Sequence, residues 1–143
     1  MIKKLKTAII GATGYTGLDL VYLLTKHPKI TITHLCATKN IGKQISFFDK
    51  RINKNLPKIS SVDKIDWKNL DLVFFSLPNG KAQKIILKKF NKYKNIKFID
   101  LSADFRIENK FIYKKNYKKQ HKAPSLIKKS IYSISEFNKK KIL

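Results

Sequence analysis

Hydrophobic positions along the 143-residue chain are grouped into short apolar runs that alternate with amphipathic stretches. The apolar, β-branched runs that predict strands occupy residues 6–10, 30–37, 71–76 and 96–101, with a weaker one within 58–62. Residues 15–26 and 81–91 carry apolar side chains at helical spacing, and Pro28 ends the first of these helices. Strands and helices that alternate through short turns form parallel pairs with right-handed crossovers. We therefore predict a doubly wound, mostly parallel α/β sheet.

Two regions of the chain show a weaker pattern. Residues 38–56 have scattered lysines and no clear period, so we expect a long loop with one helical turn at most. Residues 110–122 are dominated by lysine, tyrosine and asparagine, and we assign no element there. Further along, we expect a short helix that begins near Pro124, a strand at 131–134 and a helical turn at 136–142.

Composition and charge predict one globular domain with a strongly basic surface. Hydrophobic residues make up 43% of the chain, which is too many for a disordered protein, and the length is too short to expect two domains. The net charge of +23 would attract nucleic acid without any specific site. However, all but two of the 32 basic residues are lysine, the exceptions being Arg51 and Arg106. Base readout favours arginine, so we expect a solvated lysine coat and no specific nucleic-acid partner; a basic nucleic-acid-binding module is the alternative.

Membrane, secretory and metal-cluster classes find no support in the sequence. The longest apolar runs have the length of strands, which is too short to cross a bilayer. The N-terminal residues lack the apolar core of a signal peptide. Cys36 is the only cysteine, so an internal disulfide framework and a cysteine-based metal cluster are both excluded. We expect a cytoplasmic protein with no metal site and no membrane partner.

The segment that joins the first predicted strand to the first helix reads Gly11-Ala12-Thr13-Gly14-Tyr15-Thr16-Gly17. A dinucleotide site needs a residue without Cβ where the chain leaves the strand, where backbone N–H groups approach the pyrophosphate, and where helix meets strand. We assign these three roles to Gly11, Gly14 and Gly17 in that order. The N–H groups at the helix start, with Tyr15 and Thr16, are expected to face the phosphates. The segment therefore predicts a Rossmann-like dinucleotide-binding domain, and a tight turn that uses glycine for geometry alone is the alternative.

Two further features bear on which dinucleotide is bound. Thr13 stands where a second glycine is usual, and its hydroxyl can bond a phosphate or cap the helix. An NAD site carries an acid at the end of the second strand, but here Thr38 and Lys39 occupy that place and no acid occurs before Asp49. Both side chains can donate to a 2′-phosphate. We therefore predict NADP as the cofactor, with Lys39 as one more surface lysine as the alternative.

Three segments together resemble the N-acetyl-gamma-glutamyl-phosphate reductase family: the glycine segment, the turn Leu77-Pro78-Asn79-Gly80, and the run Ile99-Asp100-Leu101-Ser102-Ala103-Asp104-Phe105-Arg106. The resemblance implies NADPH-dependent reduction of a small acyl-phosphate substrate to an aldehyde with release of phosphate, a step of arginine biosynthesis. It also implies that Leu77 and Pro78 contact the cofactor. The related aspartate-semialdehyde dehydrogenases share this chemistry, so an aspartyl phosphate substrate is the alternative.

The same resemblance assigns substrate contacts to Ser102 and Arg106. Arg106 corresponds to an arginine that binds the substrate phosphate, which suits a planar guanidinium. The alternative for Arg106 is a salt bridge to Asp104 or Glu108. Asn79 stands where the family is expected to have histidine.

The catalytic cysteine that the resemblance implies has no counterpart among these 143 residues. In the family it lies in an Asn-Pro-Gly-Cys segment, expected here after Leu143. Cys36 ends the second predicted strand, where a buried structural role is expected. We therefore expect residues 1–143 to be a truncated dinucleotide-binding domain, inactive alone and part of a homo-oligomer at full length. We assign no role to His121.

Overall fold

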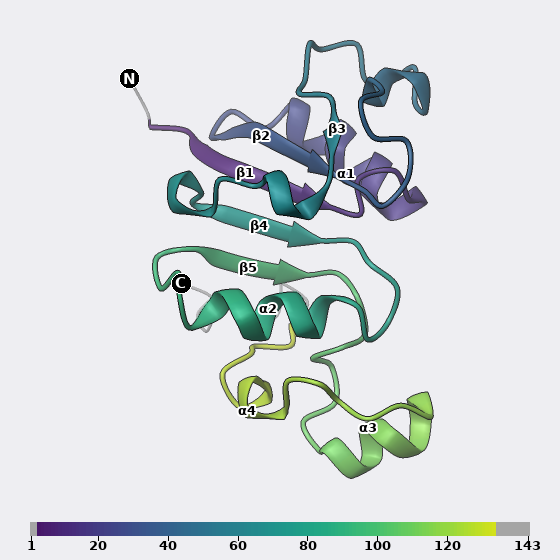
Figure 1. Ribbon diagram of the computed structural model, residues 1–143, viewed down its shortest axis with the longest axis vertical. Coiled ribbons are helices and arrows are strands. Elements are labelled where there is room, and N and C mark those ends of the chain that lie inside the picture. Colours follow the sequence, from purple (N-terminus) through teal and green to yellow (C-terminus); the bar gives the residue numbers. More distant parts are fainter. Residues whose placement is uncertain (1–2, 134–143) are drawn as a thin grey trace.

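The computed structural model describes residues 3–133, and these form a five-stranded parallel sheet in the order β3-β2-β1-β4-β5 (Figure 1). The strands are β1 (Leu5–Ile10), β2 (Ile30–Cys36), β3 (Ile59–Ser60), β4 (Leu72–Phe75) and β5 (Lys97–Asp100). Every pair in the sheet is parallel. The prediction of a doubly wound parallel sheet is confirmed.

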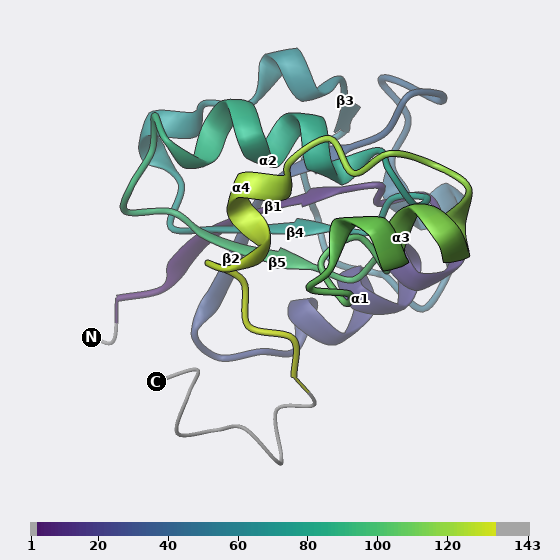
Figure 2. The same ribbon diagram turned by 90° about the horizontal axis from the view of Figure 1, so that it is seen from below.

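Helices cover both faces of this sheet. The α-helices are α1 (Tyr15–Thr25), α2 (Ala82–Phe90), α3 (Lys110–Tyr117) and α4 (Pro124–Ile127), and 3-10 turns occur at Ile45–Phe47, Val62–Lys64 and Trp67–Asn69. Seen from below, α1 and α2 lie on opposite sides of the sheet, and α3 and α4 lie beyond the β5 end of the molecule (Figures 1 and 2). None of the described helices is long and apolar enough to cross a membrane.

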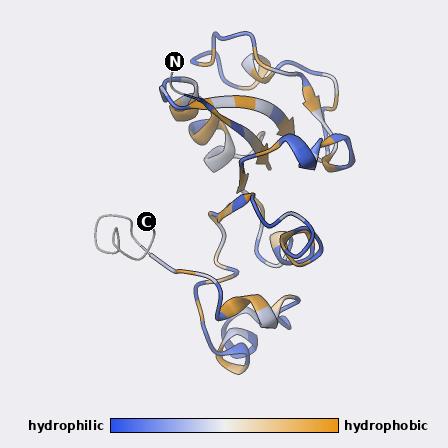
Figure 3. Cartoon of the chain, turned by 90° about the vertical axis from the view of Figure 1, so that its left-hand side faces the viewer, coloured by the Kyte–Doolittle hydropathy of each residue, from blue (hydrophilic) through white to orange (hydrophobic). Residues whose placement is uncertain are grey.

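The sheet divides the core into two hydrophobic clusters because neighbouring residues of a strand face opposite sides. Ile9 packs with Val21 and Leu24 of α1, whereas Ile10 packs with Phe75 and with α2. The central strands β1 and β4 are largely buried on both faces, which is why they read as continuous apolar runs rather than alternating ones, whereas the edge strand β5 is partly exposed. In Figure 3 the strands carry stretches of hydrophobic colour and the connecting loops are mostly hydrophilic.

The helix α3 falls in a region to which the sequence pattern assigned no element. Its start is capped by Asn109, whose side-chain oxygen accepts hydrogen bonds from the N–H groups of Phe111 (2.8 Å) and Ile112 (3.2 Å). Its end is a left-handed residue, Lys118, with φ 54°. Only Tyr113 of this helix is buried, so an apolar stripe that would reveal the helix is missing from the sequence.

The C-terminal expectations have mixed outcomes. The short helix near Pro124 is confirmed as α4, with proline in its first turn. The strand expected at 131–134 is wrong for residues 131–133, which form no strand in the described part of the chain. Ile134 and the helical turn expected at 136–142 lie outside the described residues.

A buried polar network holds α3 against α2 and the turn after β4. The Tyr113 hydroxyl accepts a hydrogen bond from Gln83 Nε2 (2.8 Å). It lies 3.0 Å from both Asp104 Oδ1 and Asn79 Oδ1, to either of which it can donate. Tyr113, Gln83 and Asp104 are fully buried. Buried polar groups are costly unless paired, so these contacts fix the relative positions of α3, α2, the turn after β4 and the loop after β5 that carries Asp104.

His121 is a second part of this network and was not assigned a role from the sequence. Its Nδ1 accepts from the Ala123 N–H (3.1 Å), so Nε2 carries the proton and donates to the Asp104 carbonyl oxygen (2.8 Å). The ring lies edge-on to Phe105 and Tyr113. Burial lowers the pKa of His121, and the nearby Asp104 offsets only part of that effect. The folded chain therefore keeps this imidazole neutral.

Tyr113→Phe tests the buried network. We expect the free energy of unfolding to fall by about 1–3 kcal/mol, because the change leaves the buried Gln83 amide without its acceptor. Tyr15→Phe, at a side chain that is 94% exposed, is the matched control and should alter it by less than about 0.5 kcal/mol. Urea denaturation followed by circular dichroism measures both. Equal effects of the two variants would contradict the role of the Tyr113 hydroxyl.

The lowered pKa of His121 makes stability pH-dependent. The imidazole of the unfolded chain has a pKa of about 6.5, and that of the folded chain has a lower pKa. Between these two values the unfolded state binds more protons than the folded state. The stability contribution is therefore fully present above about pH 6.5 and is lost as the pH falls towards the folded pKa. We expect His121→Gln to flatten the slope of unfolding free energy between about pH 7.5 and about pH 5. Burial lowers the pKa of His34 as well, so the pH dependence of His34→Gln is measured alongside to separate the contributions of the two histidines. An unchanged slope in His121→Gln contradicts the prediction.

Candidate functional site

The glycine segment follows β1 at the edge where the parallel strands end. Gly11 has φ +90°, and a Cβ atom there would lie 2.0 Å from the Ser76 carbonyl oxygen, so no other residue fits. The N–H groups of Gly11 and Ala12 both donate to the Cys36 carbonyl oxygen, at 2.8 and 3.0 Å. The turn is thereby fixed between the ends of β2 and β4.

The other two glycines differ in what the fold demands of them. A Cβ atom at Gly17 would lie 2.1 Å from the Gly11 carbonyl oxygen, so α1 can pack on the turn only with glycine there. Gly14 has φ −77° and ψ 164°, which any residue adopts, and a Cβ atom would lie 3.6 Å from its nearest neighbour, the Gly11 carbonyl oxygen. The internal packing therefore requires Gly11 and Gly17 but leaves the space beside Gly14 open.

The start of α1 offers free backbone donors to this open space. Gly14 precedes the helix, and within residues 3–133 no side chain hydrogen-bonds to the first helical turn. The capping role considered for Thr13 is therefore not observed. The first N–H groups of any α-helix lack intrahelical partners and carry partial positive charge. This arrangement is suited to an anionic group such as a phosphate.

A crevice runs between the start of α1 and the segments that follow β4 and β5. It has a volume of about 290 Å³ and is lined by Gly14, Tyr15, Thr16, Ser76, Leu77, Pro78 and Leu101. The chain after β1 crosses towards β2, whereas β4 lies on the other side of β1, so the crevice is at the topological switch point of the sheet. Ligands of open α/β sheets bind at this place.

Five of the residues predicted to bind a cofactor are thus brought together across the crevice: Gly14, Tyr15, Thr16, Leu77 and Pro78. Ser76 and Leu101 also line it and were not predicted from the sequence. The signal for them was available, because each directly follows a parallel strand on the β4 side of the switch point.

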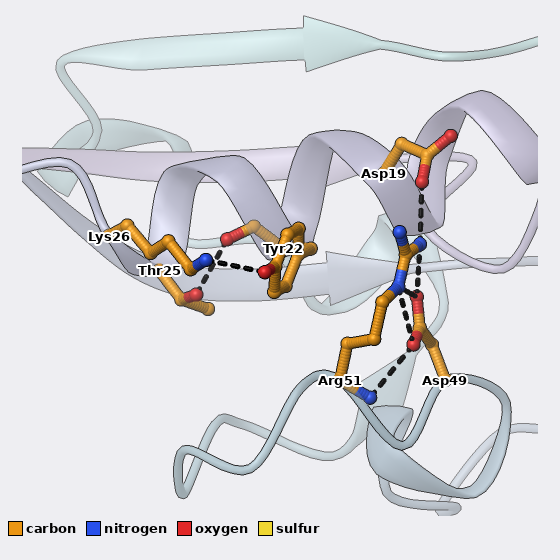
Figure 4. A network of polar contacts seen from close by, with 6 residues as sticks. All are labelled: Asp19, Tyr22, Thr25, Lys26, Asp49 and Arg51. Carbon is orange, nitrogen blue, oxygen red and sulfur yellow. Dashed lines mark hydrogen bonds and ion pairs between the residues drawn. The ribbon is translucent and has the colours of Figure 1, made fainter.

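Thr38 and Lys39 are exposed and follow β2 on the other side of the glycine segment. The Ala37 N–H donates to the Ser60 carbonyl oxygen (3.1 Å), which ties the start of this loop to β3. The first carboxylate after β2 is Asp49, which lies well beyond the strand end along the chain. Arg51 binds it (2.7 Å) together with Asp19 of α1 (2.6 Å), as Figure 4 shows. The hydrogen bonds from Arg51 lower the pKa of Asp49.

Ser102 and Arg106, the predicted substrate contacts, do not line this crevice. The Ser102 hydroxyl donates to Asp100 Oδ2 (2.8 Å) and accepts from the Asp104 N–H (3.1 Å), so it shapes the loop after β5. Burial, and to a lesser extent the charge of Asp104, raises the pKa of Asp100. Arg106 is exposed, with its guanidinium 5.7 Å from the centre of the Tyr132 ring. Its alternative salt bridge is not formed within residues 3–133.

Cys36 is fully buried at the end of β2, as predicted for a structural cysteine. Its sulfur contacts the Ser60 hydroxyl oxygen at 3.7 Å, and burial raises the pKa of the thiol. A nucleophilic cysteine needs an accessible thiolate, which this position does not provide. The described part of the chain has no group of three or more histidine, cysteine or acidic residues that could hold a metal ion.

Comparison with known proteins supports this interpretation of the fold. The chain is 44% identical over 138 residues to an N-acetyl-gamma-glutamyl-phosphate reductase of Ehrlichia canis (strain Jake), covering 95% of this chain and 39% of that protein. It is 37% identical over 142 residues to the reductase of the same name from Rhodospirillum rubrum, covering 97% and 40%. The chain thus spans about two fifths of the length of these curated relatives, and the predicted resemblance is confirmed.

A solved structure shares the fold. The crystal structure of aspartate semialdehyde dehydrogenase with NADP from Candida albicans matches with a TM-score of 0.57 and 23% sequence identity, covering 76% of this chain and 32% of that one. The family described as "Semialdehyde dehydrogenase, NAD binding domain" matches residues 6–143. By this match, and with a glycine segment at the switch point of a parallel sheet, the chain belongs to the semialdehyde dehydrogenase NAD-binding domain family.

Proposed function

We propose that the crevice at the start of α1 binds NADPH. The observation that carries this proposal is Gly14: the fold has no need of glycine there, whereas a pyrophosphate group against the backbone does. The uncapped first turn of α1 supplies N–H donors at Tyr15 and Thr16. Leu77 and Pro78 form the opposite wall of the crevice. Thr13 contributes its hydroxyl to a phosphate.

The chemistry at the end of β2 supports NADP rather than NAD as the cofactor. Thr38 and Lys39 are exposed there, and both can donate hydrogen bonds to a 2′-phosphate. Asp49, the nearest carboxylate along the chain after β2, is bound to Arg51. A 2′-phosphate would therefore meet a positive side chain rather than the acid that binds a ribose hydroxyl in NAD sites.

We further propose that the chain is the cofactor-binding part of a cytoplasmic N-acetyl-gamma-glutamyl-phosphate reductase, which the names of its relatives support. The bound dinucleotide supplies hydride, and the whole enzyme reduces the acyl phosphate to N-acetylglutamate semialdehyde and releases phosphate. In the whole enzyme, a homo-oligomer, Ser102 and Arg106 contact the substrate.

The nucleophilic cysteine belongs outside residues 1–143. The single cysteine of the chain, Cys36, is buried and its pKa is raised, so it does not supply a thiolate. The 143-residue chain therefore binds the dinucleotide without turning over the substrate. Steady oxidation of NADPH by this chain with the acyl phosphate would contradict that conclusion.

The direct test of the dinucleotide site is Gly14→Val, followed by titration with NADPH and detection by nucleotide fluorescence. We expect the affinity for NADPH to fall by about tenfold or more, because the new side chain occupies the space for the phosphates. The free energy of unfolding should change by no more than about 1 kcal/mol, since the backbone conformation at Gly14 suits any residue.

Gly17→Val is the matched comparison for this test. A side chain at Gly17 would overlap the Gly11 carbonyl oxygen, so this variant should lose stability by about 1–3 kcal/mol or more. The two variants together separate loss of binding from loss of folding. Unchanged NADPH affinity in a folded Gly14→Val protein would refute the proposed site.

Lys39→Gln tests the preference for NADP. We expect it to weaken NADPH binding by about tenfold and to leave NADH binding unchanged, because only NADPH carries the 2′-phosphate. Lys68→Gln is the control, since Lys68 is exposed in the turn that precedes β4, at the opposite edge of the sheet. Titrations at constant ionic strength measure the four combinations. Equal effects of the two substitutions would assign the loss to general charge rather than to the β2 end.

A further inference from the structure

A second cavity lies between the start of α2 and the loop that connects α3 to α4. It has a volume of about 500 Å³ and is lined by Asn79, Gly80, Lys81, Lys84, Lys119, Gln120 and Lys122. It shares no lining residue with the dinucleotide crevice. The two sites adjoin along one segment, because residues 76–78 face the crevice and residues 79–80 face the cavity.

The four lysines of this cavity converge from two walls. Lys81 and Lys84 are three residues apart and share one face of the start of α2, and Lys119 and Lys122 come from the loop after α3. In residues 3–133 both salt bridges belong to Arg51, so none of these ammonium groups is neutralised by a carboxylate. Four like charges around a concave surface raise the local concentration of anions.

Hydrogen bonds to buried side chains hold both walls in place. The Lys122 N–H donates to Oε1 of the fully buried Gln83 (2.6 Å), which ties the loop to α2. The Gly80 N–H donates to Oδ1 of the fully buried Asp104 (2.7 Å), which ties the turn to the loop after β5. A site with a fixed backbone needs less ordering when a ligand binds. These anchored walls distinguish the cavity from the lysine coat of the rest of the surface.

The start of α2 adds to the positive potential. The helix has nine residues, and its first N–H groups carry the partial positive charge of the helix dipole. No side chain of the preceding residue, Lys81, caps it. The helix therefore adds to the positive potential of the lysines, two of which come from the loop after α3 rather than from α2.

We propose that this cavity binds a small multivalent anion that carries phosphate groups, at a site distinct from the dinucleotide crevice. Lysine ammonium groups bind phosphate as point charges. The volume is that of a small-molecule site, which spans about 300–1,000 Å³. A nucleic acid would use an open stripe of charge, whereas these lysines surround a hollow. We therefore assign to this cavity a small anion that contacts both walls.

Inorganic pyrophosphate is the probe, added at constant ionic strength to the full 143-residue chain and followed by backbone amide NMR. Because pyrophosphate can also reach the glycine segment, the titration is run in the wild-type chain and in Gly14→Val. We expect the amide signals of Gly80, Lys81 and Gln120 to shift in both proteins. Shifts confined to residues 11–17, or lost altogether in a folded Gly14→Val protein, would overturn the proposal while leaving the dinucleotide site intact.

Two triple variants with the same loss of charge complete the test. Lys84→Gln, Lys119→Gln and Lys122→Gln together should weaken pyrophosphate binding by about tenfold or more, since each removes a charge-assisted contact. The control combines Lys64→Gln, Lys68→Gln and Lys97→Gln, all exposed and none of them lining the cavity, and should change the affinity by less than about twofold. Equal losses in both triples would show only general counter-ion attraction and would overturn the proposal.

Two other ligands test the chemistry of the site. Equal affinity for citrate would overturn the phosphate assignment. Tighter binding of single-stranded RNA that depends on both lysine sets would indicate a nucleic-acid surface instead.

Discussion

The close approach of Gly11 to the Ser76 carbonyl oxygen is the constraint on which the architecture of the site depends. Ile10 pairs with Phe75 at the ends of β1 and β4, so the residues that follow meet at one edge of the sheet. Only a residue without Cβ can pass there. The turn that results directs α1 across the face of the sheet opposite to α2 and places its first N–H groups at the crevice. Gly17 then lets the helix pack on the same turn.

The features that we propose for binding are those that the internal packing leaves unfilled. The core is closed without any contribution from the space beside Gly14 or from the first turn of α1. Further along the chain, residues 76–80 carry the wall of the crevice and then the wall of the lysine cavity. The buried contacts of Tyr113 and Asp104 hold this segment in place. The stabilising contacts thus lie beneath the two proposed sites rather than on their surfaces.

The strands β1 and β4 were predicted correctly because burial on both faces leaves a continuous apolar run in the sequence, and the apolar residues of the partly exposed β2 and β5 were sufficient to indicate strands there as well. The helix α3 left no such signal, since Tyr113 is its one buried residue and its cap, Asn109, looks like an ordinary polar loop residue. The sequence around His121 likewise gave no signal of its burial. Its burial arises from rings at Phe105 and Tyr113 that are distant in sequence, so nothing local indicates it.

The amino-acid sequence by itself determined the parallel sheet, the glycine turn and the dinucleotide character of the domain, because each depends on local periodicity or on a few adjacent residues. Tertiary structure alone decided that Gly14 is dispensable for packing while Gly11 and Gly17 are not. It also brought lysines from two separate segments around one cavity. Both outcomes depend on distances between atoms far apart along the chain, and such distances exist only after the sheet has assembled.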